Sequence, residues 1–205
     1  MHPEAIILRQ KRVFDKLKNF PEYYLAGGTA LALQIGHRIS IDFDFFSKKE
    51  IPFQLLPKIR KIFKNSKVEI IINHLEQLTI SINGVNLTFV KYSFPLIFKL
   101  KEYKGIRLLS VLEIAATKAY VMGRRATLKD YVDLYYILKE KYLTLPKIIE
   151  VCQKKYKGEF NLRLFLEQLI YLEDLKEMDI EFIKTPVSKE QMAKFFQEEV
   201  KKIKF

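Results

Sequence analysis

The spacing of apolar residues along the chain changes its character near residue 110. Before that point, stretches with the spacing of a helix alternate with stretches in which every second residue is apolar, as in a strand. From Ser110 onward only the helical spacing is found. The pattern predicts an α+β fold, in which a mixed part covering residues 1–109 is followed by an α-helical part covering residues 110–205.

Strands and helices of the first part follow from this pattern. In residues 40–47, Ile41, Phe43 and Phe45 fall on one side of a predicted strand. Asn83-Gly84, between two alternating runs, is typical of a hairpin with a type I′ turn. The predicted helices are 3–19, 29–37 and 52–64, the predicted strands are 22–26, 40–47, 68–72 and the hairpin 79–92, and residues 94–109 fit a short helix and a short strand around Lys104-Gly105.

The second part shows amphipathic helices with recognisable starts. A serine or threonine followed three residues later by an acid or amide can cap a helix start from both sides. Such pairs are Ser110 with Glu113, Thr127 with Asp130, and Ser188 with Gln191, and residues 123–126 are predicted to interrupt the helical pattern. The predicted helices are 110–122, 127–141, 146–156, 161–172 and 188–203.

The net charge of +12 narrows the choice of partners. Residues 1–110 carry +9 of it, and a field of that sign attracts nucleotides, nucleic acid or an acidic partner. An AT-rich genome, which gives lysine-rich proteins, explains the same excess equally well. The single cysteine, Cys152, excludes an internal disulfide framework. No run approaches the ~18 apolar residues of a membrane span, so we expect a soluble, cytoplasmic protein that does not bind membranes.

Two aspartates in the predicted strand 40–47 are the first candidates for chemistry. Asp42 and Asp44 alternate with Phe43, so their side chains point to the same face. Two carboxylates held close together repel unless a cation neutralises them, and Mg²⁺ is the usual oxygen-seeking ion. A pair of this kind is also common on a solvated strand edge.

The second candidate is the turn Gly27-Gly28-Thr29, where a predicted strand ends and a helix begins. Glycine lets a phosphate approach the backbone, and the N–H groups of a helix start attract anions. A glycine pair before a helix is most often only a turn. Its position upstream of the two aspartates is more specific, because one element can bind phosphates and the other the metal that bridges them. The order predicts metal-assisted phosphoryl or nucleotidyl transfer.

These residues carry a resemblance to a known family. The string GGTALAL, followed by HRISIDFDFF, resembles the AbiEii/AbiGii toxin family of the nucleotidyltransferase (polymerase-β-like) superfamily. Lys118 and the segment RRATLKDYVDLYYIL resemble further motifs of that family. The resemblance covers about residues 20–140. It implies a nucleotidyltransferase-type mixed β-sheet flanked by helices, followed by the α-helical part.

The family's activity is the transfer of a nucleoside monophosphate from an NTP to an acceptor. Some members modify the 3′ end of tRNA and are opposed by an antitoxin, so the resemblance implies NTP, Mg²⁺, an RNA acceptor such as tRNA and a cognate antitoxin. Carried over by position, the implied nucleotide-binding residues are Gly27, Gly28, Thr29 and Arg38, the implied metal ligands are Asp42 and Asp44, and Lys118 and Asp130 join the aspartates as catalytic residues.

One position departs from the family pattern. The third carboxylate is expected on the hairpin strand, where this chain has Thr88. Threonine can neither neutralise a cation nor accept a proton at neutral pH. Asp130 can supply the missing carboxylate, a single metal can suffice, or the protein can bind NTP without turnover.

Some of these residues can instead have purely structural roles. Asp130 can serve only as a helix cap, Lys118 can extend to the surface, and Asp133 can pair with a nearby cation among residues 124–129. The alternatives for the whole protein are a degenerate nucleotide- or RNA-binding protein and a protein-modifying nucleotidyltransferase. The basic residues of the first predicted helix can follow an RNA backbone or form a solvated face: Arg9, Lys11, Arg12, Lys16 and Lys18.

Overall fold

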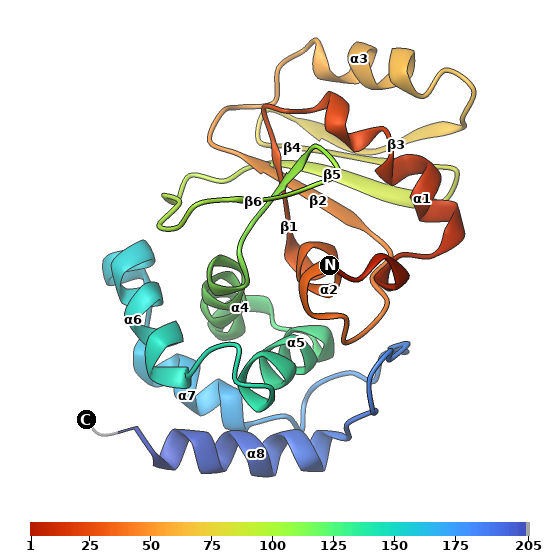
Figure 1. The fold of residues 1–205 in the computed structure, drawn as a ribbon. Helices are drawn as coiled ribbons and strands as arrows, with labels where there is room; N and C mark the ends of the chain where they lie inside the picture. Colours follow the sequence, from red (N-terminus) through yellow and green to blue (C-terminus); the bar gives the residue numbers. More distant parts are fainter. Residues whose placement is uncertain (204–205) are drawn as a thin grey trace. The chain divides into compact units, whose positions relative to one another are not determined.

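A computed structural model describes residues 1–203 and divides the chain into two compact units (Figure 1). Residues 1–94 and 100–109 form the first unit, and residues 95–99 join the chain from Ser110 onward in the second. Among the described residues, no helix has both the length and the apolar composition needed to cross a lipid bilayer.

The first unit is built on one mixed sheet of seven strands, in the order β3-β4-β5-β2-β1-β7-β6. The β1–β7 and β2–β5 pairs are parallel and the remaining pairs antiparallel. The predicted α+β fold is confirmed. The strands are β1 (Tyr24–Ala26), β2 (Phe43–Ser47), β3 (Val68–His74), β4 (Gln77–Ile82), β5 (Val85–Lys91), β6 (Lys101–Tyr103) and β7 (Ile106–Leu108).

One face of the sheet carries the core of this unit. Phe43 and Phe45 of β2 are buried there, and Phe14 of α1 lies with its ring centroid 6.0 Å from that of Phe43. Phe89 of β5 stacks on Phe45 at 5.7 Å. Because side chains alternate along a strand, Asp44 points to the opposite face. The helical segments of the unit are η1 (Pro3–Ala5), α1 (Leu8–Phe14), η2 (Leu17–Asn19), α2 (Gly27–Ile35) and α3 (Leu55–Ile62).

The predicted helix 3–19 is wrong as one element, because the chain forms three short helical pieces there. The backbone is extended at Ile6 and Ile7, which separates η1 from α1. The side chain of Gln10 accepts a hydrogen bond from the Ile7 N–H at 2.8 Å, which starts α1 at that point. A buried polar residue on the apolar face therefore determines where the helix begins.

The predicted strand 40–47 is too long, since β2 begins at Phe43. The carbonyl oxygens of Ser40 and Ile41 accept hydrogen bonds from the Gln10 side chain, and that of Asp42 accepts one from Thr29 Oγ1. These carbonyls bond side chains instead of a neighbouring strand. Ile41 is exposed, contrary to the prediction.

Residues 94–109 also differ from the prediction, because they hold the β6–β7 hairpin in place of a short helix and one strand. Lys104 and Gly105 form its turn, with φ of 52° and 75°. Strands of three residues are too short to show an alternating pattern. The Asn83-Gly84 hairpin is confirmed, with φ of 50° and 79° at the turn.

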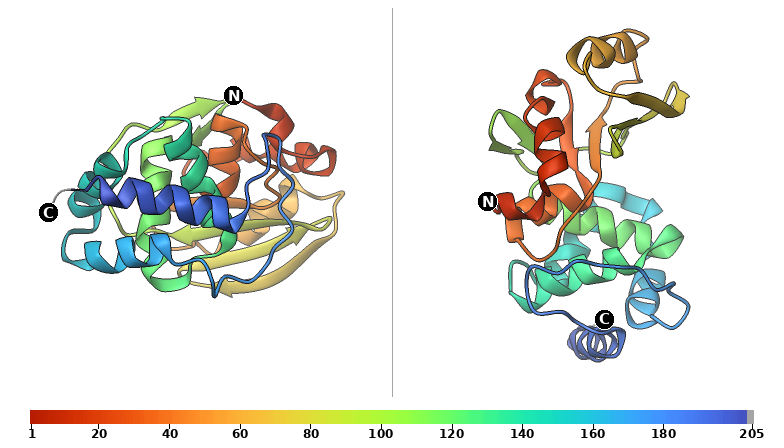
Figure 2. Two further views of the ribbon diagram at one scale, coloured as in Figure 1. Left: turned by 90° about the horizontal axis from the view of Figure 1, so that it is seen from below. Right: turned by 90° about the vertical axis from the view of Figure 1, so that its right-hand side faces the viewer.

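The second unit is helical. Helix α4 continues through the predicted break at residues 123–126 and ends at Arg125. A Cβ at Gly123 would lie 2.9 Å from Leu164 Cδ2, so the glycine allows close packing of α4 on α7 and does not end the helix. Helix α8 packs against α5 and α7 (Figure 2). The elements are α4 (Val111–Arg125), α5 (Leu128–Lys139), α6 (Leu145–Tyr156), η3 (Lys157–Glu159), α7 (Leu162–Ile170) and α8 (Lys189–Lys201).

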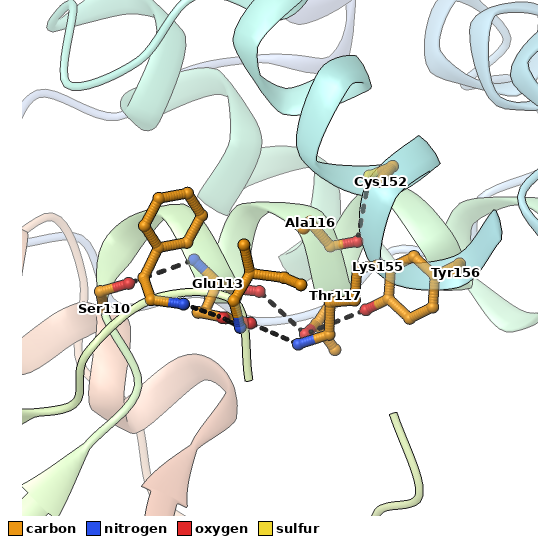
Figure 3. Close-up of polar contacts among 9 residues, drawn as sticks. Ser110, Glu113, Ala116, Thr117, Cys152, Lys155 and Tyr156 are labelled. Carbon is orange, nitrogen blue, oxygen red and sulfur yellow. Dashed lines mark hydrogen bonds and ion pairs between the residues drawn. The ribbon is translucent and has the colours of Figure 1, made fainter. Parts of the chain in front are cut away.

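A buried ion pair lies at the centre of the second unit (Figure 3). Lys155 of α6 pairs with Glu113 of α4, and both side chains are fully buried. Glu113 also accepts hydrogen bonds from the backbone N–H groups of Ile97 and Phe98, the latter at 2.9 Å. Ser110 Oγ accepts from the Glu113 N–H, but the Glu113 carboxylate bonds these other groups, so only half of the predicted capping box forms.

Candidate functional site

The glycine pair lies where β1 ends and α2 begins. Gly27 has a φ of +64°, a left-handed conformation that glycine adopts without strain. A Cβ at Gly27 would lie 2.6 Å from Asp44 Oδ2, so the carboxylate occupies the space next to the glycine. Ala26, the N-cap residue, has no side-chain oxygen to cap the first turn of α2. The turn therefore brings backbone N–H groups and a carboxylate close together.

Arg38 lies against the second glycine. A Cβ at Gly28 would be 2.5 Å from Arg38 Nη2 and 3.3 Å from Ser40 Oγ, so any side chain here would displace the guanidinium from its present position. Arg38 is almost fully buried, and its Nη1 donates to the Ile39 carbonyl at 3.0 Å. The structure thus places a fixed positive charge at the N-terminal end of α2, where an anion is already favoured.

Thr29 connects the glycine turn to the segment before β2. Its buried hydroxyl donates to the Asp42 carbonyl oxygen and lies 2.8 Å from Ser40 Oγ, from which it can accept a second hydrogen bond. The Gln10 amide holds the same segment through the carbonyl oxygens of Ser40 and Ile41. The backbone that carries exposed Asp42 is therefore fixed by side chains from two different helices.

Asp44 is the first member of a polar row across three neighbouring strands. In the sheet register Asp44 of β2 lies opposite Thr88 of β5, and Thr88 lies opposite Thr79 of β4. The two threonine hydroxyl oxygens are 3.3 Å apart. The residue directly beside Asp44 on β5 is therefore a neutral hydroxyl.

The carboxylates and the glycine turn fit a divalent cation shared with a phosphate ligand. Mg²⁺ is usually bound by one or two carboxylates, substrate phosphates and water. Asp44 lies at the glycine turn, where a phosphate would also bind, and Asp42 precedes it by two residues. Within the described part of the chain, no three His, Cys, Asp or Glu side chains are grouped as a complete set of metal ligands. The two carboxylates are thus an incomplete ligand set, and a cation held by them would need phosphate or water as further ligands.

A second polar cluster lies between α4 and α5. Lys118 Nζ is 2.8 Å from Asp130 Oδ1 and 2.5 Å from Asp133 Oδ2. The Lys118 side chain is 8% exposed and that of Asp133 is fully buried, so this lysine does not extend to the surface. Asp130 Oδ2 also accepts hydrogen bonds from the N–H and hydroxyl of Thr127, which confirms the predicted capping box.

The surroundings of Asp130 determine its ionisation. Burial alone would raise the pKa of its carboxyl, but the charge and hydrogen bond of Lys118, together with the Thr127 N–H, outweigh burial and lower that pKa. Asp130 is therefore ionised at neutral pH. In the cluster of Lys118, Asp130 and Asp133, one ammonium therefore lies between two carboxyl groups.

We expect Asp130→Asn to lower the free energy of unfolding by about 1–2 kcal/mol at pH 7, because it removes a capping group and an ion-pair partner. The pKa of Asp130 is lower in the folded chain, so its contribution is full above the unfolded value, near 3.8, and is lost as the pH falls through the lowered pKa. Urea unfolding between pH 7 and pH 3 should show the difference from wild type shrinking below about pH 4. An undiminished difference at pH 3 would contradict this account, and exposed Asp179→Asn is the control.

The structure brings the predicted site residues together in two groups, one in each unit. Gly27, Gly28, Thr29, Arg38 and the two aspartates 42 and 44 form the first, and Lys118 with Asp130 the second. Sequence analysis overlooked Ser40 and Gln10, and did not name Lys118 as the ion-pair partner of Asp133. Gln10 gave a signal, because it interrupts the apolar face of a helix.

Comparisons with known proteins agree with this architecture. The family model described as nucleotidyl transferase AbiEii toxin, Type IV TA system, matches residues 11–84 and 74–205. An uncharacterized protein of Aquifex aeolicus (strain VF5) is 32% identical over 182 residues, which cover 88% of this chain and 87% of the relative.

Solved structures share the fold. MenT4, a nucleotidyltransferase toxin from Mycobacterium tuberculosis H37Rv, is 11% identical with a TM-score of 0.60, over 96% of this chain and 84% of that one. JHP933 from Helicobacter pylori is 18% identical with a TM-score of 0.56, over 98% of this chain and 94% of that one. The family match spans most of the sequence and confirms the resemblance carried by the glycine turn and the paired aspartates. The chain therefore belongs to the AbiEii family of nucleotidyl transferase toxins.

Proposed function

We propose that the protein transfers a nucleoside monophosphate from an NTP to an RNA acceptor, tRNA, as the toxin of a toxin–antitoxin pair. The observation that carries the proposal is the contact of Asp44 and Arg38 with the two glycines that begin α2. A carboxylate for a metal and a cation for phosphate flank one backbone turn, which is what binding a metal–triphosphate requires. Family membership supports the reaction class.

Roles follow from these contacts. The N–H groups at Gly27 and Gly28 and the Arg38 guanidinium bind the triphosphate, and Thr29 positions the backbone of Asp42. Asp42 and Asp44 hold Mg²⁺, which when bound neutralises phosphate charge. The fixed turn orients the α-phosphate toward the acceptor hydroxyl.

Lys118 and Asp130 are proposed to act as a pair. Because two carboxyl groups already engage the Lys118 ammonium, it is less available to a phosphate. Asp130 is our candidate for the acidic group that Thr88 does not provide, and Lys118 keeps its carboxylate ionised and oriented.

Labelling tests the proposal directly. Purified protein is incubated with Mg²⁺, total tRNA and each α-labelled NTP in turn, and RNA and protein are then separated. We expect label in RNA from at least one NTP, and none when the metal is chelated. Label in protein alone would show a protein-modifying transferase.

A second candidate function rests on Thr88, which lies where a carboxylate would complete the row with Asp44. In this alternative the protein binds NTP or RNA without turnover. Calorimetry separates the two candidates, because NTP binding that is accompanied by no label in any product supports the alternative and contradicts transfer.

A further inference from the structure

A basic groove crosses the surface of the first unit, away from the glycine turn. It lies between α1, the end of α3 and the β4–β5 turn (Figure 1) and has a volume of about 670 Å³. We define the basic groove by the polar residues that line it: Arg9, Arg12, Asp15, Lys16, Asn65, Ser66 and Asn83.

The positive charges of the basic groove come from α1 and from Lys16, which follows it. Arg9 and Arg12 are three residues apart on α1, so they share one face of that helix, and both are exposed. Lys16 Nζ donates to the Ile62 carbonyl at 3.0 Å and lies 5.0 Å from the centre of the Phe63 ring. Three cations therefore face one carboxylate, that of Asp15.

The opposite wall supplies neutral hydrogen-bonding groups. Asn83 accepts from the Lys67 N–H at 2.9 Å and donates its own N–H to the Lys67 carbonyl at 3.0 Å, which fixes the β4–β5 turn against the start of β3. Arg and Lys together with Asn and Ser are the side chains that contact phosphate and sugar in nucleic-acid complexes. Protein-binding surfaces are instead depleted of Lys, Asp and Ser, three of the residue types that line this groove. The groove therefore favours a nucleic-acid backbone over an acidic protein.

Helix α1 connects the basic groove to the candidate site. Between Arg9 and Arg12, Gln10 points the other way and holds the carbonyl oxygens of Ser40 and Ile41, just before Asp42. A strand of RNA in the groove would thus lie about one helix diameter, ~10 Å, from the segment that carries Asp42.

We infer that the basic groove binds the phosphate backbone of the RNA acceptor. This inference rests on the proposed function for its choice of RNA, and on the groove itself for the location. Its chemistry is phosphate recognition without base readout, so binding is independent of RNA sequence and strongly dependent on salt.

Binding of fluorescent total tRNA, measured by anisotropy without NTP, tests the inference. In Arg9→Gln/Arg12→Gln we expect the affinity at ~0.1 M salt to fall about tenfold, and the slope of log K against log salt to decrease by about 1.5. The matched control is Lys48→Gln/Lys49→Gln, which should change affinity less than about twofold. These two exposed lysines follow the last residue of β2, whereas Asp42 precedes its first residue. Circular dichroism confirms that both variants are folded.

Other results of the binding experiment would overturn the inference or assign the groove to another partner. Equal losses in the two variants would overturn the inference, because net charge alone would then explain binding, and so would an unchanged affinity in the groove variant. Competition by polyglutamate as effective as that by tRNA would assign the groove to an acidic protein instead. If wild type labels no RNA but the groove variant loses RNA affinity, the proposed function fails and the inference about the groove stands. If wild type labels RNA but the groove variant binds RNA as tightly as wild type, the proposed function stands and the inference about the groove fails.

Discussion

Asp44→Asn is expected to lower the rate of nucleotide transfer at least about a hundredfold, because the amide removes a negative charge that a metal–triphosphate needs. The carboxylate is half-buried beside Gly27, and asparagine has nearly the same shape, so the fold should persist. The measurement is the initial rate of labelling at saturating NTP. Glu102→Gln, an exposed carboxylate on β6, removes the same charge elsewhere in the unit and should keep the rate within about twofold.

A double variant asks whether the two polar groups serve one step. If Asp44 and Asp130 act together, Asp44→Asn/Asp130→Asn should be little slower than Asp44→Asn alone, because effects within one catalytic group are not additive. Multiplication of the two single effects would show that Asp130 acts elsewhere, and would leave its capping role. Wild-type rates in Asp44→Asn would reject the metal-binding assignment outright.

Lys155→Met is expected to lower the free energy of unfolding by about 3–5 kcal/mol, which is the largest effect on stability that we expect. It would leave the Glu113 carboxylate fully buried without its ammonium partner. Burial lowers the pKa of Lys155 and the Glu113 carboxylate opposes that shift, so the pair is held against a substantial desolvation cost. Urea unfolding monitored by helix signal provides the measurement.

The neighbouring lysine is the matched control for this variant. Lys154 is exposed on the same helix, so Lys154→Met should change the free energy of unfolding by less than about 0.5 kcal/mol. Lys155→Met/Glu113→Gln should be less destabilised than the sum of its single variants, because no unpaired buried charge remains. A loss in Lys155→Met as small as that in Lys154→Met would show that the ion pair contributes little.

Regular periodicity predicted most of the second unit. Helices α5 to α8 lie within about two residues of the predicted ranges, because amphipathic spacing and capping residues act locally. Gly123 shows the limit: it was interpreted as a helix break, whereas its missing side chain makes room for Leu164 from another helix. Local sequence does not record such a contact between distant residues.

Side chains that bond backbone across long sequence distances account for part of the errors. Gln10 shortens the strand that carries the aspartates through bonds to residues 30 and 31 positions away, and it starts α1 through a local bond from the Ile7 N–H. Glu113 likewise looked like a capping residue, but its carboxylate bonds Lys155 and the backbone of residues 97 and 98. Gln10 and Glu113 each have a local role in the sequence, and in the structure each also bonds groups far away in the sequence.

The candidate site was predictable as a set of residue types, but its arrangement was not. The order of the glycine pair and the aspartates indicated phosphate and metal binding, and the register confirms that Thr88 is the neighbour of Asp44. The fit of Arg38 beside Gly28 could not be foreseen, because it depends on the path of the chain after α2. The assigned roles stay predictions until the kinetic measurements are made.

The route of the chain between the units determines how this protein can be divided and assembled. Residues 95–99 belong to the helical unit, yet they precede β6 and β7, which complete the sheet of the first. Cleavage after Leu109 would leave the backbone donors of Glu113 on the N-terminal fragment and Glu113 itself on the other. During synthesis, these donors emerge from the ribosome well before Lys155, so the buried ion pair can close only after α6 has been made. The contacts of Glu113 are thus completed late, and only when two separate stretches of chain are both present.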